Sequence, residues 1–264
     1  HVPDTSNRGA VNNGGSVICG IAMFEKDPEL CSSIIENGLR ALEYVTDMLY
    51  PDGAWHEGAG YWSYMSDYLA NTVTTLESTF GSDFNILKTP ALEKSVYFSI
   101  YAGGPTGLDN FEDTNYDKKE QYSTAYMWYA KEYDNAGLGK LRKYFTKDGK
   151  TNSTVKDLLF YNPEWNTMSD IDLPLDKTFS GKEYASMRSS FYEDSAVFLG
   201  LHGGPVDSAH GHMDNGSFVV DMLGERWATD IPHDDYSLVN KNLKQQYFLY
   251  RRSPEGHNCL VINP

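Results

Sequence analysis

Apolar residues in the first 160 positions recur at the three- and four-residue spacing of amphipathic helices. The segment 28–50 opens on a proline suited to a first helical turn, and its apolar stripe consists of Leu30, Ile34, Ile35, Leu42, Val45, Met48 and Leu49. A second stripe follows the glycine-rich loop 51–60 and consists of Tyr61, Tyr64, Met65, Tyr68, Leu69, Thr72, Val73 and Leu76. Two amphipathic helices joined in this way are expected to pack as antiparallel neighbours.

Weaker helical patterns follow at 90–101, 121–133 and 153–160, and we expect loops at 103–115 and in the glycine- and lysine-rich stretch 137–150. After a turn-rich segment at 162–176 the apolar pattern becomes that of strands, at 184–191, 195–202, 216–223, 225–230 and 257–263. Helices first and strands second predict an α+β protein rather than a βαβ sheet. The expected division is a helical part, 1–165, and a sheet part, 166–264.

Composition and charge narrow the class of protein. The chain has 264 residues, is 40% hydrophobic and 22% charged, and contains no apolar run long enough to cross a bilayer. A formal charge of −15 argues against nucleic acid and against insertion into membranes. An anionic polymer could bind only at a local basic cluster, for which the candidates are Arg8, Arg188, Arg251 and Arg252. The three cysteines form no CxxC pair and predict no disulfide framework.

Two histidines, two residues apart, are the strongest chemical signal in the sheet part. If residues 210–212 form a strand, His210 and His212 face the same side and can converge on one point. Asp230 and His257 are further donors, and two imidazoles with a carboxylate form a common zinc site. Spacing alone would make both histidines ligands, and the alternative is that they are buried structural residues.

Four sequence blocks resemble the heparinase II/III-like polysaccharide lyases. HGHMDNGSFVVDMLGERWATDIPHDDY (210–236) and YRRSPEGHNCLVIN (250–263) are similar to the sheet signature of that family. SNRGAVNNGGSVICGIAM (6–23) and YPDGAWHEGAGYWSYM (50–65) are similar to its helical segments. The resemblance implies a partial (α/α) toroid of antiparallel helices, followed by an antiparallel β-sandwich, with the chain truncated at both ends relative to complete members.

The same resemblance implies a reaction and its residues. These lyases cleave 4-linked uronic-acid polymers by β-elimination. Asn7 would neutralise the uronate carboxylate, Tyr61 would act as base and acid, and His210 would assist; Asn7 and Tyr61 are 61 − 7 = 54 positions apart, as the family pattern requires. His212, Asp230 and His257 would bind one structural zinc ion. The chain departs from the family at Arg8, where a tryptophan is usual.

Four further residues are expected at the substrate: Arg8, Glu57, Trp62 and Arg188. Glu57 would also hold the loop that positions Tyr61. A tyrosine with an ordinary pKa near 10 is a poor base at neutral pH, so we expect nearby positive charge or strong hydrogen-bond donors to lower the pKa of Tyr61. Arg8, Arg188 or His210 could supply them. Without the resemblance, Tyr61 would be assigned to the core, because its helix face is rich in aromatic residues.

Two other functions remain open at this point. A zinc-dependent hydrolase would use His210, His212 and Asp230 around an activated water. A non-catalytic carbohydrate-binding protein would need no base. The expected partner is an acidic polysaccharide. The truncation relative to complete members raises the alternative that the chain associates with a second copy or with another chain. The resemblance also implies a secreted or periplasmic location.

Overall fold

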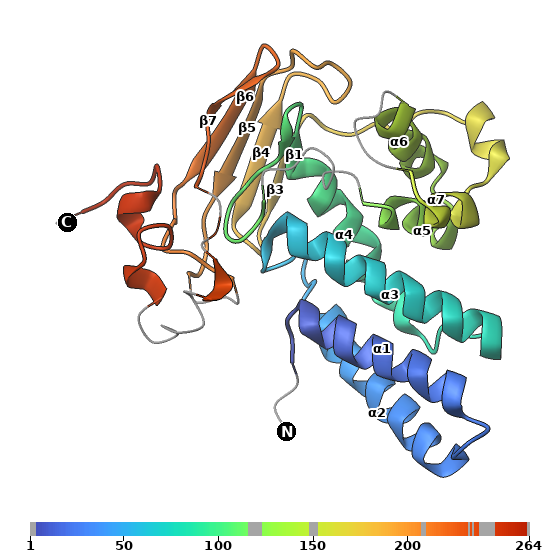
Figure 1. Ribbon diagram of the computed structural model, residues 1–264. Helices are drawn as coiled ribbons and strands as arrows, with labels where there is room; N and C mark the ends of the chain where they lie inside the picture. The colour runs from blue at the N-terminus through green and yellow to red at the C-terminus, as the bar shows by residue number, and fades with distance from the viewer. Residues whose placement is uncertain are drawn as a thin grey trace.

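The computed structural model is an α+β protein, as predicted, in which helices precede an antiparallel sheet (Figure 1). It describes residues 4–115, 123–147, 153–206, 210–231, 233, 235–237 and 246–262. The helices are α1 (Asn7–Met23), α2 (Pro28–Asp47), α3 (Gly58–Phe80), α4 (Pro90–Tyr101), α5 (Ala125–Glu132), α6 (Ala136–Lys147) and α7 (Val155–Phe160). Short 3₁₀ helices are η1 (Ile86–Lys88), η2 (Pro163–Thr167), η3 (Gln246–Phe248) and η4 (Pro254–Gly256).

Helices α1, α2 and α3 form one layer, in which α1 packs on both α2 and α3. The predicted pairing of α2 with α3 as packed antiparallel neighbours is therefore wrong, because α1 lies between them. Both α1 and α3 begin at the end nearest the sheet, and α2 runs back toward the sheet on the side of α1 that faces away from α3 (Figure 1). The Ser6 and Asp27 side chains cap α1 and α2 by accepting from the backbone N–H of Arg8 and Leu30. Because α1 and α3 start side by side, the residues of their first turns face the same region of the molecule.

Glycine allows α1 and α2 to approach closely. A Cβ atom built on Gly38 of α2 would lie 2.5 Å from Val17 Cγ2 and 3.1 Å from the carbonyl oxygen of Asn13, both on α1. Real Cβ atoms do not approach other heavy atoms to 2.5 Å, so only glycine fits at this contact. The buried face of α2, which includes Ile35, Leu42 and Val45, matches the predicted stripe except at Leu30, which is 56% exposed.

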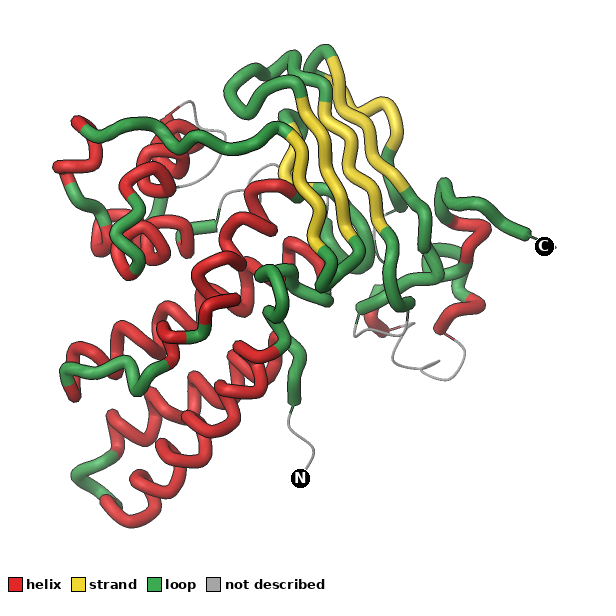
Figure 2. Tube along the Cα trace, turned by 180° about the vertical axis from the view of Figure 1, so that it is seen from behind, coloured by secondary structure: helices red, strands yellow, loops and turns green. Residues whose placement is uncertain are grey.

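The sheet contains five antiparallel strands in sequence order: β3 (Asp176–Phe179), β4 (Tyr184–Arg188), β5 (Phe198–His202), β6 (Phe218–Met222) and β7 (Glu225–Ala228). One face packs on α4, where Phe98 contacts Tyr184 edge to face at a ring distance of 5.7 Å. A short hairpin of β1 (Gly103–Gly104) and β2 (Gly107–Leu108) lies on that same face. Seen from behind, the opposite face is covered by none of the described helices (Figure 2).

The segment 101–115 attaches the helices to the sheet through buried arginines. Arg188 of β4 donates to the carbonyls of Tyr101 at 2.7 Å and Gly103 at 2.8 Å. Arg226 of β7 donates to the Leu108 carbonyl at 2.7 Å and to Asp221. The prediction that Arg188 contacts substrate is therefore wrong in this structure, because the residue is 8% exposed and its guanidinium donates to two backbone carbonyls.

Several sequence-based elements differ from the structure. Residues 136–147 form helix α6 rather than a loop, and the glycine at 139 permits close contact, since a Cβ there would lie 2.2 Å from Trp165. Strand β3 was not predicted. Residues 210–212 and 257–262 are irregular rather than strands. His210 even has a positive φ of 66°, which a strand excludes.

The change from helix to strand falls between Thr167 and Asp176. The division into parts at 165 and 166 stays a prediction. Among the described helices, none combines the length and apolarity that a bilayer-spanning helix needs.

Candidate functional site

Six segments that are distant in sequence meet at one end of the sheet, next to the starts of α1 and α3. The meeting point brings together Asn7, Glu57, Tyr61, Asp113, His210, His212, Tyr236 and Arg252 through the contacts described below. Figure 1 shows why: the loops between strands and the segments after β7 lie beside the first turns of these two helices. Three of these residues, Asn7, Tyr61 and His210, are the predicted catalytic set.

Glu57 is a fully buried carboxylate that anchors Asn7. The backbone N–H of Asn7 donates to Glu57 Oε2 at 2.5 Å, and Asn7 Nδ2 lies 3.1 Å from both carboxylate oxygens. The indole of Trp55 donates to the same Oε2 at 3.1 Å. Burial raises the pKa of Glu57, and the Asn7 hydrogen bond and the His210 charge offset part of that rise. Glu57 thus joins α1 to α3, and its 0% exposure argues against its predicted contact with substrate.

His210 connects Glu57 to Tyr61. Its Nε2 lies 3.5 Å from Glu57 Oε1, and its ring stacks on Tyr61 with centroids 3.9 Å apart and planes at 11°. Its other nitrogen, Nδ1, lies 2.8 Å from Asp113 Oδ2. His210 therefore connects the two parts of the predicted site: it stacks on Tyr61 of α3 and lies beside Glu57, which binds Asn7 of α1.

The hydroxyl of Tyr61 is hydrogen-bonded to the hydroxyl of Tyr236. Tyr236 also donates to Asp113 Oδ2 at 3.1 Å and lies 3.3 Å from His210 Nδ1. Burial raises the pKa of Tyr61, and the charges of Asp113 and Glu57 act in the same direction against the Tyr236 contact. The predicted lowering of this pKa is wrong in the structure as it stands: the phenol is the favoured form.

Asp113 is the most highly connected carboxylate of the site. It accepts from Arg252 Nη2, at 2.9 Å to Oδ1 and 2.6 Å to Oδ2. Its Oδ1 also lies 2.9 Å from His212 Nε2. Burial raises the pKa of Asp113, but the hydrogen bonds from His210 and His212 and the charge of Arg252 outweigh it and hold the pKa below its usual range. Asp113 is therefore ionised and bound on both oxygens.

Buried donors beside this network fit a metal ion. His212, Asp214 and His257 offer ligand atoms that all lie within 4.8 Å of one another. Among the described residues, His212 Nδ1, Asp214 Oδ2 and His257 Nε2 have no hydrogen-bond partner, although each is buried. Two imidazoles and a carboxylate are ligands that zinc prefers, and unpaired buried polar atoms are costly unless a ligand satisfies them.

Asp230 lies beside this trio rather than within it. Its Oδ1 lies 2.6 Å from His257 Nδ1, and Asn110 donates to its carbonyl at 2.6 Å. In this position Asp230 orients the imidazole of His257, as carboxylates commonly do for histidines that bind metals. Its Oδ2 is a further buried oxygen without a hydrogen-bond partner among the described residues. The assignment of Asp230 as a ligand thus stays a prediction, and Asp214 joins it as a candidate.

Two of the remaining predicted residues lie away from the network. Trp62 is fully buried and packs on Tyr126 and Tyr129 in the helical core, so the prediction that it stacks on a sugar is wrong in this structure. Arg8 is exposed and lies 3.5 Å from Asp4.

His56, next to Glu57, has its pKa lowered to about 4 by burial and by the Lys182 charge, so it is neutral at pH 7.

Sequence reasoning did not identify Asp113 or Tyr236. It gave Asp214 the tasks of shaping the turn and of supporting the zinc ligands, but not that of a ligand. Asp113 falls in a stretch interpreted as a loop between helices. Tyr236 stands at the end of the quoted family block, where its aromatic character gave no role. For Asp113, the signal in the sequence was that the segment 103–115 combines several polar residues with three glycines.

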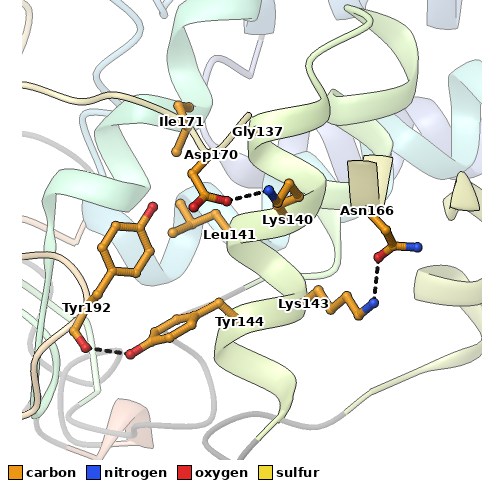
Figure 3. Close-up of a pocket in the computed structure, with 9 residues that line it drawn as sticks. All are labelled: Gly137, Lys140, Leu141, Lys143, Tyr144, Asn166, Asp170, Ile171 and Tyr192. Carbon is orange, nitrogen blue, oxygen red and sulfur yellow. Dashed lines mark hydrogen bonds and ion pairs between the residues drawn. The ribbon is translucent and has the colours of Figure 1, made fainter. Parts of the chain in front are cut away.

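A separate pocket lies between α6, η2 and the segment before β5 (Figure 3). Its volume is about 390 Å³, and it is lined by Gly137, Lys140, Leu141, Lys143, Tyr144, Asn166, Asp170, Ile171 and Tyr192. Lys140 pairs with Asp170 at 2.6 Å, and Lys143 donates to Asn166 at 2.6 Å. None of the predicted site residues lines this pocket.

Comparison with known proteins supports the fold. No family model and no curated protein matches the chain. Among solved structures, a heparinase III gene product matches with a TM-score of 0.67 and 20% identity, over 94% of this chain and 35% of that protein. The heparan sulfate lyase HepC from Pedobacter heparinus matches with a TM-score of 0.66 and 18% identity, over 96% of this chain and 37% of that protein. The chain has the fold of the matching part of these proteins.

Proposed function

We propose that this chain carries the active site of a polysaccharide lyase that cleaves 4-linked uronic-acid polymers by β-elimination. The stacking of His210 on Tyr61, with Glu57 joining His210 to Asn7, is the observation that supports it most. The fold shared with two proteins described as a heparinase and a heparan sulfate lyase supports the same class of reaction. The chain spans 35–37% of their length, so activity of the whole protein is part of this proposal.

In the proposed reaction, Asn7 and His210 donate hydrogen bonds to the uronate carboxylate and stabilise the charge that develops there. Tyr61, as the phenolate, removes the proton on C5, and the electron pair of that bond forms the C4=C5 double bond. The C4–O4 bond breaks, and the Tyr61 phenol returns the proton to O4. No water is consumed, and the new non-reducing end is an unsaturated uronate.

Tyr61 must lose its own proton before it can act as a base. Its hydroxyl partner, Tyr236, also contacts Asp113 and His210, so these groups offer the proton a path away from Tyr61. The raised pKa of Tyr61 suits the first half of the reaction, because the phenolate, once formed, is a stronger base toward the proton on C5.

Zinc would have a structural task in this scheme. His212 and His257, with Asp214 or Asp230, would hold the ion, and the ion would fix the loop that carries His210. The side chains of His212, Asp214 and His257 are all 0% exposed. Burial on all sides favours this role over a zinc-dependent hydrolase, in which the metal must contact substrate and water.

The test is an assay of the product on a panel of heparin, heparan sulfate, hyaluronan and alginate. A lyase gives ultraviolet absorbance from the unsaturated end, and the product masses add up to the mass of the substrate. A hydrolase gives products heavier by one water and no such absorbance. Binding without either product would support a carbohydrate-binding protein and would refute the proposal.

A further inference from the structure

One buried carboxylate contacts both histidines of the HxH pair, each through a different oxygen. Asp113 Oδ2 lies 2.8 Å from His210 Nδ1, and Asp113 Oδ1 lies 2.9 Å from His212 Nε2. Asp113 is 3% exposed and lies 97 and 99 residues before its partners. The two histidines have different surroundings beyond this contact: His210 stacks on Tyr61, and His212 belongs to the buried metal-ligand trio.

The contact fixes which nitrogen of each ring carries a proton. An ionised carboxylate accepts, so His210 donates from Nδ1 and His212 donates from Nε2. His210 keeps the Nδ1–H donor in its doubly protonated form, in which Nε2–H faces Glu57 and is the donor to the uronate carboxylate in the proposed reaction. His212 presents an unprotonated Nδ1 toward Asp214 and His257, which is the form that a metal ion requires.

Arg252 holds this arrangement in place from the other side. Its Nη2 donates to both oxygens of Asp113, and its Nη1 donates to the carbonyl of Gly211 at 3.2 Å. Gly211 is the residue between the two histidines. Arg252 therefore ties the carboxylate to the backbone of the very loop whose side chains the carboxylate orients.

The backbone at His210 needs such support. Its φ of 66° lies in the left-handed region, which is costly for a residue with a side chain and persists where surrounding contacts enforce it. In the described structure, the contacts of this side chain are with Asp113, Glu57, Tyr61 and Tyr236. Among these, Asp113 is the group that also holds the next histidine.

We propose that Asp113 is a positioning residue that couples the catalytic imidazole of His210 to the metal-binding imidazole of His212. One carboxylate orients both rings, so a metal ion bound at His212 stabilises the orientation of His210 without touching substrate. The catalytic part of this inference rests on the proposed lyase function, whereas the orientation of the two rings does not.

The first test uses the unaltered, zinc-loaded protein. Long-range ¹H–¹⁵N spectra of the histidine side chains report which ring nitrogen is protonated. The inference predicts protonated Nδ1 at His210 and protonated Nε2 at His212. The opposite tautomer at either ring would overturn it. This measurement is independent of any activity, so it remains decisive if the lyase assay is negative.

The second test compares Asp113→Asn with a matched control, Asp109→Asn. An asparagine offers one accepting oxygen, so it can satisfy one of the two imidazoles but not both. We expect Asp113→Asn to weaken zinc binding 10–100-fold in competition with a chelating dye, and to lower kcat about 100-fold with KM within twofold. Asp109 is equally buried in the same segment, beside Tyr184, and its variant should keep wild-type zinc affinity and kcat.

Loss in both measurements for Asp113→Asn supports the coupling. Wild-type zinc affinity in a folded Asp113→Asn variant would overturn it, as would equal losses in the Asp109→Asn control, because a general packing effect would then be sufficient. If the wild-type chain cleaves none of the polymers, the lyase proposal fails alone, and zinc affinity still decides the role of Asp113.

Discussion

Asp109 is a buried carboxyl group whose environment opposes ionisation. It is 3% exposed, and among the described residues its Oδ2 has no hydrogen-bond partner. Burial raises the pKa of Asp109 from 3.8 to about 7, although Tyr184, Arg226 and His202 act in the opposite direction. The folded protein therefore keeps a proton on Asp109 that the unfolded chain releases above pH 4.

This proton gives a pH-dependent prediction. Between pH 4 and 7 the folded state binds more protons than the unfolded state, so the free energy of unfolding falls as pH rises, by at most about 4 kcal/mol from this group. Asp109→Asn removes the effect. In urea unfolding, the free energy of unfolding of Asp109→Asn minus that of wild type should increase from pH 4 to pH 8. An equal difference at both pH values would contradict a proton held by Asp109 in the folded state.

At the scale of residues, candidate catalytic residues could be predicted from the sequence where they belong to a recognisable motif. Asn7, Tyr61 and His210 lie in blocks that resemble a known family, and the structure joins them through Glu57. Asp113 escaped prediction because its contacts span about 100 residues and follow no periodicity. Trp62 was wrongly placed because an aromatic residue beside the motif looks the same whether it faces a sugar or the core.

At the scale of elements, close helix packing predicts opposite effects on stability when Gly38 and Gly15 are each replaced by alanine. Gly38 of α2 faces Val17, whereas a Cβ built on Gly15 of α1 meets no heavy atom within 4 Å. Alanine at 38 should therefore lower the free energy of unfolding by about 1–2 kcal/mol through overpacking. Alanine at 15 should raise it by about 0.5–1 kcal/mol through helix propensity. Denaturant unfolding measures both, and a gain in both variants would refute the close contact.

Helices with one clear apolar stripe were predicted well, because burial on one face determines the spacing. Helix α4 spans the predicted residues 90–101. Helix α6 was missed because its two glycines suggest a loop, and only the structure shows that Gly137 and Gly139 sit against Ile171 and Trp165. The expected strand at 210–212 failed because the loop conformation there depends on Asp113 and Arg252, which are remote in sequence.

At the scale of the whole molecule, the proposed metal site would link the loop after β5 to the segment around η4, through His212 and His257. A ligand that binds only the folded state stabilises it, by about 2.7–4.1 kcal/mol at 100–1,000 times the dissociation constant. We expect chelation of zinc to lower the thermal midpoint and His257→Ala to abolish that response. If neither zinc nor chelator changes the thermal unfolding midpoint, then His212, Asp214 and His257 bind no metal.

The α+β order of the chain was predictable because it follows from where helical and strand periodicities occur. The number of helices around the site was not predictable from these periodicities. The chain spans 35–37% of the length of the solved structures that it matches. Association with a second copy or another chain therefore stays a prediction. Which face of the sheet the helices cover did not follow from any one strand, since β4, β5 and β6 all alternate between more and less buried positions. Among the described helices, none covers the face opposite α4 (Figure 2).

The central claim is that the Tyr61 hydroxyl performs the proton transfers of β-elimination. The most direct measurement is the rate at which unsaturated uronate forms with Tyr61→Phe, compared with Tyr64→Phe, which removes an exposed hydroxyl from the same helix. We predict at least a 100-fold loss for Tyr61→Phe, with an unchanged fold by circular dichroism, and a wild-type rate for Tyr64→Phe. A wild-type rate in Tyr61→Phe would contradict the account.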